Sequence, residues 1–334
     1  MSPQFVDFDA DGHLDIVAGT FDGSPHLARG SSKGFAQPEP ILDADGVRIA
    51  IHDFWNFDTS KWENTSRGDA PGEPPAKGHA TSAIAVDDDG DGDLDLLLGD
   101  HKTGHVYRRE NRGTAARPAF ARENRRVLAG GAPIDVPGTV ATLRLVDWDH
   151  DGRVDLLVGS MGDAYAEGPG GGVFWFRNGG DGKATRYEAP VTLIAPSQKD
   201  ATEATRPDSG LYMDAGDVDG DGDLDLVVGG YSHWRAKAPI LDDAQQRHLT
   251  AIRSELQALD TALGELNRLA QEAGKGLPEA EAGKRYTEFY KGQKAERDAN
   301  RAARMPLQTE LDALVPSMQR RSFTWLYENT TKRR

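Results

Sequence analysis

Residues 217–225 read DVDGDGDLD, and the same nine-residue pattern occurs four times in the chain. The other copies are DFDADGHLD at 7–15, DDDGDGDLD at 87–95 and DWDHDGRVD at 147–155. Each copy fits D-x-D-x-D-G-x-[LV]-D and is followed by a short apolar run that ends in glycine. The copies begin 80, 60 and 70 residues apart. Four matches to one pattern of this length indicate a repeat protein.

The residue types at the fixed positions suit a metal site. Aspartates at positions 1, 3 and 5 direct carboxylates into one small loop, and glycine at position 6 permits a tight turn with positive φ. Position 7 varies, as expected of a residue that offers only its backbone carbonyl, and the aspartate at position 9 suits bidentate closure. This is the ligand logic of an EF-hand loop in a shorter frame. Oxygen ligands without histidine or cysteine favour Ca²⁺ over zinc or copper, and Mg²⁺ prefers octahedral sites that keep their waters.

The alternative interpretation of such a run is a solvated acidic turn without an ion. Four copies with an invariant glycine and an invariant final aspartate favour metal ligation instead, with about four Ca²⁺ sites. The expected role of such a site is structural, because it pins a turn between two strands.

The charge of the chain follows from these loops. The formal net charge is −15, made of −17 over residues 1–239 and +2 over residues 240–334, and the four loops alone hold 19 acidic residues. Much of the acidity is therefore expected to be ligand. Nucleic-acid binding is disfavoured because it needs a basic face. No apolar run is long enough to span a membrane, and the absence of cysteine excludes disulfides and thiolate zinc sites.

Short strands flank every loop and predict an all-β fold. In the second unit, TSAIAVD (81–87) leads into the loop, LDLLLG leads out, and GHVYRREN (104–111) and PAFARENRRVL (118–128) follow. The first and third units repeat this order. Four short antiparallel strands per repeat describe the blade of a β-propeller. We therefore expect a β-propeller of at least four blades, with each loop joining the innermost strand of a blade to the second.

The pattern resembles the FG-GAP or VCBS repeats of integrin α-chain propellers and of many bacterial surface proteins. The resemblance covers roughly residues 3–234 and 321–329. It implies Ca²⁺ held by the aspartates at positions 1, 3, 5 and 9 and by the backbone carbonyl at position 7. The implied ligands are Asp7, Asp9, Asp11, His13 and Asp15; Asp87, Asp89, Asp91, Asp93 and Asp95; Asp147, Asp149, Asp151, Arg153 and Asp155; and Asp217, Asp219, Asp221, Asp223 and Asp225.

The chain departs from a regular propeller in residues 44–80, an insertion that contains HDFWNFDTSKWEN. It is open whether this insertion is a degenerate blade without its loop or a surface loop. Its aromatic residues either plug a face of the propeller or form a contact for a sugar or a protein.

A second departure splits the fourth unit. Its third strand, SFTWLYEN at 322–329, follows an insertion of roughly 85 residues, and no outer strand follows it. We expect imperfect closure of the ring, or completion by an upstream segment, and we expect a leader or an earlier segment before Met1.

The insertion in the fourth unit is predicted to be helical. Leucines and Ile252 recur at three- and four-residue steps from Leu249 to Leu269, after a helix cap at Asp242 or Asp243. A second helix is expected from about 279 to 304, interrupted at Pro306. The pattern predicts a coiled-coil hairpin that either satisfies itself or docks a partner or a second copy. The predicted domains are residues 1–239 (propeller blades), 240–318 (helical hairpin) and 319–334 (returning propeller strand).

No catalytic motif occurs in the sequence: H-E-x-x-H, G-x-S-x-G, a P-loop and the Rossmann glycines are all missing. The leading hypothesis is a non-catalytic, calcium-binding module for binding, adhesion or scaffolding, with a protein or glycan ligand. The alternatives are a polysaccharide lyase or hydrolase, or a lectin that uses Trp55 and Trp62. Extracellular Ca²⁺ fills weak sites, so we expect a secreted, periplasmic or cell-surface location.

Overall fold

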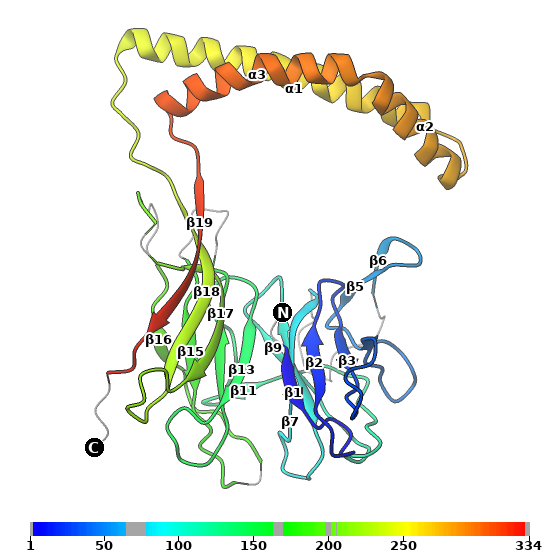
Figure 1. Cartoon of the computed structure of the whole chain (residues 1–334), viewed down its shortest axis with the longest axis vertical. Coiled ribbons are helices and arrows are strands. Elements are labelled where there is room, and N and C mark those ends of the chain that lie inside the picture. The colour runs from blue at the N-terminus through cyan, green and yellow to red at the C-terminus, as the bar shows by residue number, and fades with distance from the viewer. Residues whose placement is uncertain are drawn as a thin grey trace. The chain divides into compact units, whose positions relative to one another are not determined.

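The computed structural model describes residues 3–64, 78–162, 170–182, 184–197, 202–204 and 206–330. They form two compact units, one of residues 1–233 with 320–334 and the other of residues 234–319. The chain is mostly β, with six separate sheets and three helices (Figure 1). The expected β-rich fold with a helical insertion is thereby confirmed.

Each copy of the acidic pattern lies in one of four larger sheets, between its first and second strands. Neighbouring strands in these sheets pair antiparallel. The first sheet has the order β1 (Gln4–Val6), β2 (Asp15–Gly19), β3 (Pro25–Ala28) and β4 (Glu39–Pro40). The second has β7 (Ala80–Val86), β8 (Asp95–Asp100), β9 (Val106–Arg109) and β10 (Arg125–Arg126). The third has β13 (Thr142–Val146), β14 (Asp155–Gly159), β15 (Val173–Phe176) and β16 (Val191–Ile194). The fourth has β17 (Ser209–Gly216), β18 (Asp225–Trp234) and β19 (Gln319–Tyr327).

The remaining strands make two small hairpins, β5 (Asp53–Asn56) with β6 (Lys61–Asn64), and β11 (Leu128–Ala129) with β12 (Ala132–Pro133). The first of these is the aromatic insertion, whose residues 65–77 lie outside the described part of the chain. The predicted outer strand at 118–128 shrinks to the two-residue β10, and the outer strand of the first sheet, β4, is equally short. Proline and charged residues in both stretches disfavour longer strands.

The core lies between successive sheets, which explains the continuous apolar runs. In β8, Leu96 and Leu98 belong to the cluster shared with the first sheet, whereas Leu97 belongs to the cluster shared with the third. All three are fully buried. Side chains alternate across a strand, so a strand that is sandwiched between two neighbouring sheets must be apolar on both faces.

The glycine that ends each apolar run lets the next sheet approach. A Cβ at Gly99 would lie 2.0 Å from the backbone oxygen of Ala141, and one at Gly159 would lie 2.4 Å from that of Leu211. Both oxygens belong to the next repeat. At Gly229 in the fourth sheet, the nearest atom would be the backbone oxygen of Tyr212 in the same sheet, at 3.9 Å. The glycine at the end of the apolar run is therefore needed only in sheets on which a further sheet packs, because a Cβ there would clash with that sheet's backbone.

We expect Gly99→Ala to lower the free energy of unfolding by about 3 kcal/mol, because a backbone oxygen cannot move aside cheaply. Gly229→Ala is the matched control and should change it by less than about 0.5 kcal/mol, because open space receives the methyl group. Urea unfolding followed by circular dichroism measures both. Equal effects of the two substitutions would contradict the close approach of the next sheet at Gly99.

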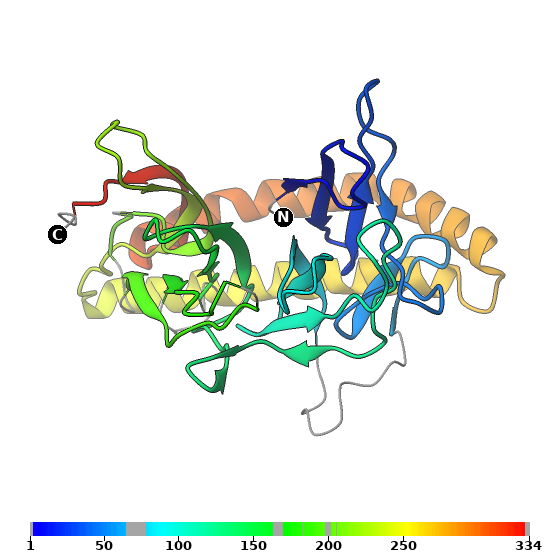
Figure 2. The ribbon, with the colours of Figure 1, turned by 90° about the horizontal axis from the view of Figure 1, so that it is seen from below.

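The four large sheets form an open series rather than a closed ring. Strands of the first sheet pack on the second, the second on the third, and the third on the fourth. In Figure 2 the first sheet (blue) and the fourth (yellow-green and red) lie at the two ends of this series. Closure of the expected propeller is therefore not seen in the described residues.

The second unit consists of α1 (Asp243–Ala273), α2 (Glu279–Gly292) and α3 (Lys294–Leu314), with α1 packed against both others. Asp242 caps α1 in a capping box with Gln245. The predicted break at Pro306 is wrong, because α3 continues through this proline and the helices separate at Gln293. Gly292 weakens the helix there, while packing on α1 outweighs the local cost of Pro306. None of the described helices is long and apolar enough to cross a membrane.

Candidate functional site

The four acidic loops occupy the same place in their sheets. We call them loop 1 (residues 7–15), loop 2 (87–95), loop 3 (147–155) and loop 4 (217–225). They join β1 to β2, β7 to β8, β13 to β14 and β17 to β18. Each loop therefore connects the first strand of its sheet to the second, as the sequence predicts.

The carboxylate at position 1 shapes each loop from inside. In loop 1, Asp7 accepts hydrogen bonds from the backbone N–H groups of Asp11 and Gly12, both at 3.0 Å. Asp147 accepts the N–H groups of the same two positions, 5 and 6, both at 3.0 Å. Asp87 and Asp217 instead accept those of positions 4 and 6, both of them glycine, at 2.7 and 3.1 Å. The glycine at position 6 has φ between 85° and 94° in all four loops. The predicted positive φ is confirmed at all four glycines.

The aspartate at position 9 ties the loop to the third strand of its sheet. In loop 2, Oδ2 of Asp95 accepts the N–H of Asp88 at 3.3 Å and Oδ1 accepts the N–H of Asn111 at 2.7 Å. Equivalent bonds reach Gly30 from Asp15, Asn178 from Asp155 and Asn329 from Asp225. All four carboxylates are at most 1% exposed. These bonds to the third strand were not predicted from the sequence, although the recurring Asn111, Asn178 and Asn329 mark them.

The carboxylates at the predicted positions converge. In each loop, one oxygen from each of three aspartates lies within 4.8 Å of the other two. The converging residues are Asp7, Asp9 and Asp15; Asp87, Asp89 and Asp91; Asp147, Asp149 and Asp155; and Asp217, Asp219 and Asp225. Such crowding of like charges raises the free energy of the empty loop.

The remaining predicted residues lie at positions 5 and 7. The position-5 carboxylates of Asp11, Asp91, Asp151 and Asp221 accept the N–H of the position-7 residues His13, Asp93, Arg153 and Asp223 at 2.8–3.0 Å. The Asp93 side chain is buried, and its Oδ1 accepts no hydrogen bond among the described residues. Oδ1 of Asp9 is likewise shielded without a donor. Two shielded carboxylate oxygens without donors suit an added cation.

Arginines pair with three of the loops, which sequence reasoning missed. Arg29 pairs with Asp9 in loop 1. In loop 2, Arg108 lies 2.6 Å from Asp89 and 2.8 Å from Asp95. In loop 3, Arg177 lies 2.5 Å from the carboxylate of Asp149 and 2.8 Å from that of Asp151. All three arginines lie in or directly after the third strand, so the residues GHVYRREN and GGVFWFRN contain the signal.

Loop 4 differs from the other three. The structure places no guanidinium or ammonium group within ion-pair distance of Asp217, Asp219 or Asp225 among the residues it describes. Glu328, which precedes Asn329, takes the position that Arg29 and Arg177 hold before their own anchoring N–H groups. Among the described residues, the converging carboxylates of Asp217, Asp219 and Asp225 therefore have no arginine or lysine as a counter-charge.

The pKa values separate loop 2 from loop 4. Burial raises the pKa of Asp95 to about 7, although the Asn111 N–H and Arg108 favour its ionised form. In loop 4, the N–H groups of Asn329 and Val218 lower the pKa of the equivalent Asp225. The position-9 carboxylate of loop 4 is thus ionised at neutral pH, whereas a pKa of about 7 leaves that of loop 2 partly protonated there.

Comparison with known families agrees with the repeat pattern. A family model described as FG-GAP-like repeat matches residues 87–158 and again residues 147–228. Residues 87–228 thus match the FG-GAP-like repeat twice. The two matches run from loop 2 to the strand after loop 3, and from loop 3 to the strand after loop 4.

Other comparisons add little to the FG-GAP-like repeats. No curated protein matches the chain. Among solved structures, a mutant Tc holotoxin pore of Photorhabdus luminescens matches 68% of this chain with 19% identity and a TM-score of 0.29. The chain spans only 8% of that chain. A TM-score this low has no bearing on the fold.

Position 4 of the FG-GAP-like loops carries a cost that the sequence pattern does not show. Its residue has positive φ in every loop: Ala10 at 55°, Gly90 at 78°, His150 at 56° and Gly220 at 81°. Glycine adopts this conformation freely, whereas a residue with a Cβ is strained by about 1–2 kcal/mol. Loops 1 and 3 therefore contain backbone strain that loops 2 and 4 avoid.

We expect Ala10→Gly to raise the free energy of unfolding by about 1 kcal/mol, because it removes this strain at loop 1. The reciprocal substitution Gly90→Ala should lower it by a similar amount at loop 2. Both are measured by urea unfolding in excess chelator, so that no ion contributes. A loss of stability in Ala10→Gly would refute the strain.

Proposed function

We propose that this chain is a calcium-binding module of β-propeller type that serves in binding, adhesion or scaffolding rather than catalysis. The observation that carries the proposal is a cluster of three converging carboxylates in each of four repeats, with positions 1 and 3 common to all of them. The FG-GAP-like repeats support a binding or adhesion role at the family level.

The donor set favours calcium. The converging atoms are all carboxylate oxygens, which hard cations prefer. Aspartates at positions 1 and 3 would hold the ion in every loop, together with position 9 in loops 1, 3 and 4 and position 5 in loop 2. Bound Ca²⁺ supplies positive charge that offsets the mutual repulsion of these carboxylates. Four ions would also cancel more than half of the formal net charge of −15.

The proposed location is outside the cytosol, at the cell surface, in the periplasm or secreted. Sites that already contain arginine counter-charges should bind Ca²⁺ weakly, and only calcium-rich surroundings fill weak sites. The packing of each sheet against the next supports the propeller part of the proposal, because blades of a propeller pack face against face in the same way. Further strands from the same polypeptide or a partner would complete the ring.

A thermal melt of the chelator-stripped protein tests the proposal. We expect Ca²⁺ to raise Tm steeply, because each ion that binds only the folded state adds about 2.7 kcal/mol at 100 times its Kd. Mg²⁺ should raise Tm much less. The measurement is differential scanning fluorimetry over a titration of each ion at fixed ionic strength. An equal response to both ions, or none, would refute calcium binding.

Substitutions in single loops sharpen this test. Asp219→Asn in loop 4 should remove a larger share of the Ca²⁺-induced rise in Tm than Asp149→Asn in loop 3, where Arg177 already pairs with the carboxylate. Asp58→Asn, on the exposed tip of the β5–β6 hairpin, serves as the control for loss of one charge. Equal effects of the two loop substitutions would mean that the arginines do not compete with the ion.

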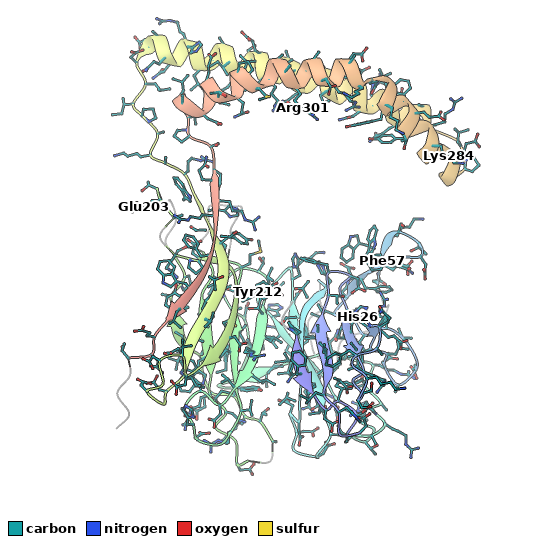
Figure 3. The ribbon with its side chains drawn as sticks, viewed as in Figure 1. His26, Phe57, Glu203, Tyr212, Lys284 and Arg301 are labelled. Atoms are coloured by element: carbon teal, nitrogen blue, oxygen red, sulfur yellow. The ribbon has the colours of Figure 1, made fainter. Side chains whose placement is uncertain are left out.

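The β5–β6 hairpin favours carbohydrate binding as a second candidate function. Phe57 lies at its tip (Figure 3) and is 71% exposed, while Trp62 is 51% exposed. The Trp62 ring meets Trp55 edge-on at 5.9 Å and lies 4.8 Å from His79, which stacks on His101 at 4.5 Å. A supported and exposed aromatic ring suits the apolar face of a sugar.

Polar groups lie next to this aromatic platform. Asp53 contacts His52 at 2.6 Å and Lys102 at 3.3 Å. Burial lowers the pKa of His79 to about 4, so its imidazole is neutral at physiological pH. These groups offer both donors and acceptors for sugar hydroxyls. The exposure of Trp62 favours the contact interpretation of the insertion over a purely packing role.

We expect Trp62→Ala to abolish binding to whichever neutral polysaccharide retards the wild-type protein in affinity gel electrophoresis. Its folding should be nearly intact, because about half of the side chain already faces solvent. Phe5→Ala, at a 59% exposed ring in β1, is the matched control and should leave binding unchanged. Unchanged retardation of Trp62→Ala would exclude this candidate.

A further inference from the structure

The fourth sheet lacks the strand that covers the outer edge in the other three. In the first three sheets, β4, β10 and β16 pair with the third strand. In the fourth, β19 holds the third position, beside β18, and is the outermost of the described strands (Figure 1). One row of its backbone N–H and C=O groups therefore faces outward without a strand partner.

β19 lacks three of the features that usually protect an edge, although Arg320 and Arg321 carry charge near its start. It is nine residues long, whereas β3, β9 and β15 have four each. Its sequence, QRRSFTWLY, contains no proline and no lysine. Natural edge strands avoid pairing through shortness, proline, lysine or bulges. A long edge without them is a template for another strand.

The side chains of β19 form an ordered ladder on one face. Arg321 lies over the ring of Phe323 at 5.3 Å, and the rings of Phe323, Trp325 and Tyr327 follow at centroid distances of 5.8 and 6.2 Å. Trp325 and Leu326 are 39% and 37% exposed. The equivalent aromatics of β15, Phe174 and Phe176, are buried. The ladder of β19 is thus incompletely covered.

The sequence of β19 is complementary to itself in the antiparallel sense. If two copies pair about Thr324, the positively charged start of one strand meets the acidic end of the other. The cross-strand pairs are Arg320 with Glu328, Arg321 with Tyr327, Ser322 with Leu326, Phe323 with Trp325, and Thr324 with Thr324. Opposite charges, aromatic pairs and Thr–Thr pairs are the favourable cross-strand combinations in antiparallel sheets.

We propose that β19 pairs antiparallel with β19 of a second copy of this chain, forming a two-fold symmetric dimer through a continuous six-stranded sheet. The symmetry follows from the interface, because a strand centred on Thr324 presents the same residues to its own copy. The pairing uses the backbone and side chains of β19 and needs no ion in the loops, so the proposal does not rest on calcium binding. A single strand pair buries little area, so we expect a weak dimer with micromolar affinity.

Charge reversal tests the register on the full-length chain. The symmetric dimer contains the pair of positions 320 and 328 twice. Arg320→Glu turns both pairs into two facing acidic residues, and Glu328→Arg turns both into two facing arginines. Each single substitution should weaken self-association about tenfold, since two attractive pairs become repulsive. Sedimentation equilibrium over a range of protein concentrations, in saturating Ca²⁺ and again in chelator, gives the dissociation constants.

Mixing the two single variants tests the proposed register directly. A heterodimer of Arg320→Glu with Glu328→Arg restores two opposite-charge pairs, so the equimolar mixture should associate as strongly as the wild type. This arm also controls for folding, because Arg320 lies over the ring of Tyr231 at 3.9 Å and its loss could disturb the sheet. Lys284→Glu, an exposed position of α2 (Figure 3), should leave the dissociation constant unchanged.

Three results would overturn the proposal. The first is a wild-type protein that stays monomeric at every concentration, which would leave this edge to another partner. The second is self-association that neither charge reversal weakens, which would place the interface elsewhere. The third is a mixture of the two variants that associates no better than each alone.

Discussion

Each repeat depends on one buried carboxylate that holds two separate chain segments by their backbone N–H groups. One aspartate in each loop (Asp15, Asp95, Asp155 or Asp225) accepts one N–H from its own loop and one from the second residue after the third strand. A side chain shorter than aspartate would not reach both N–H groups. An asparagine would place an NH₂ donor against one of these N–H groups, where only an acceptor fits. This single residue sets the depth of the loop, the path of the third strand and the place where the other carboxylates gather.

The same arrangement creates an electrostatic problem that the repeats solve in two ways. Carboxylates held within 4.8 Å of one another repel, and burial strengthens the repulsion. Loops 1, 2 and 3 place an arginine against the carboxylate at position 3. At loop 4 the structure shows no such arginine against Asp219 among the described residues, and the proposed Ca²⁺ would balance the charge there. The four loops share one backbone geometry but differ in how their charge is balanced.

The sequence predicted the features that depend on local chemistry. The period of the pattern and the apolar runs predicted the antiparallel strands on either side of every loop, and the invariant glycine predicted the positive φ of Gly12 and its equivalents. The cap and the leucine spacing predicted α1. Closure of a propeller, occupancy by Ca²⁺ and the role of the helices remain predictions.

The features that sequence reasoning missed depend on which segments meet in space. The contact of Arg108 with loop 2 requires knowing that β9 lies beside β8. The need for glycine at Gly99 arises only because the third sheet packs on the second. The continuation of α3 through Pro306 depends on packing that no local propensity reveals. The positive φ of Ala10 and His150 was hidden because their residue types usually avoid it.

The split of the fourth sheet has a consequence for the order in which the molecule assembles. The hydrogen bond from Asn329 to Asp225 joins residues 104 positions apart, whereas the equivalent bonds in the other sheets span 15 to 23 positions. During synthesis, the first three sheets have all their strands long before β19 leaves the ribosome. Contacts between distant residues form slowly because the intervening chain must first be ordered. The fourth sheet is therefore the last to mature, and until β19 arrives the nascent chain exposes the edge of β18 to any other strand nearby.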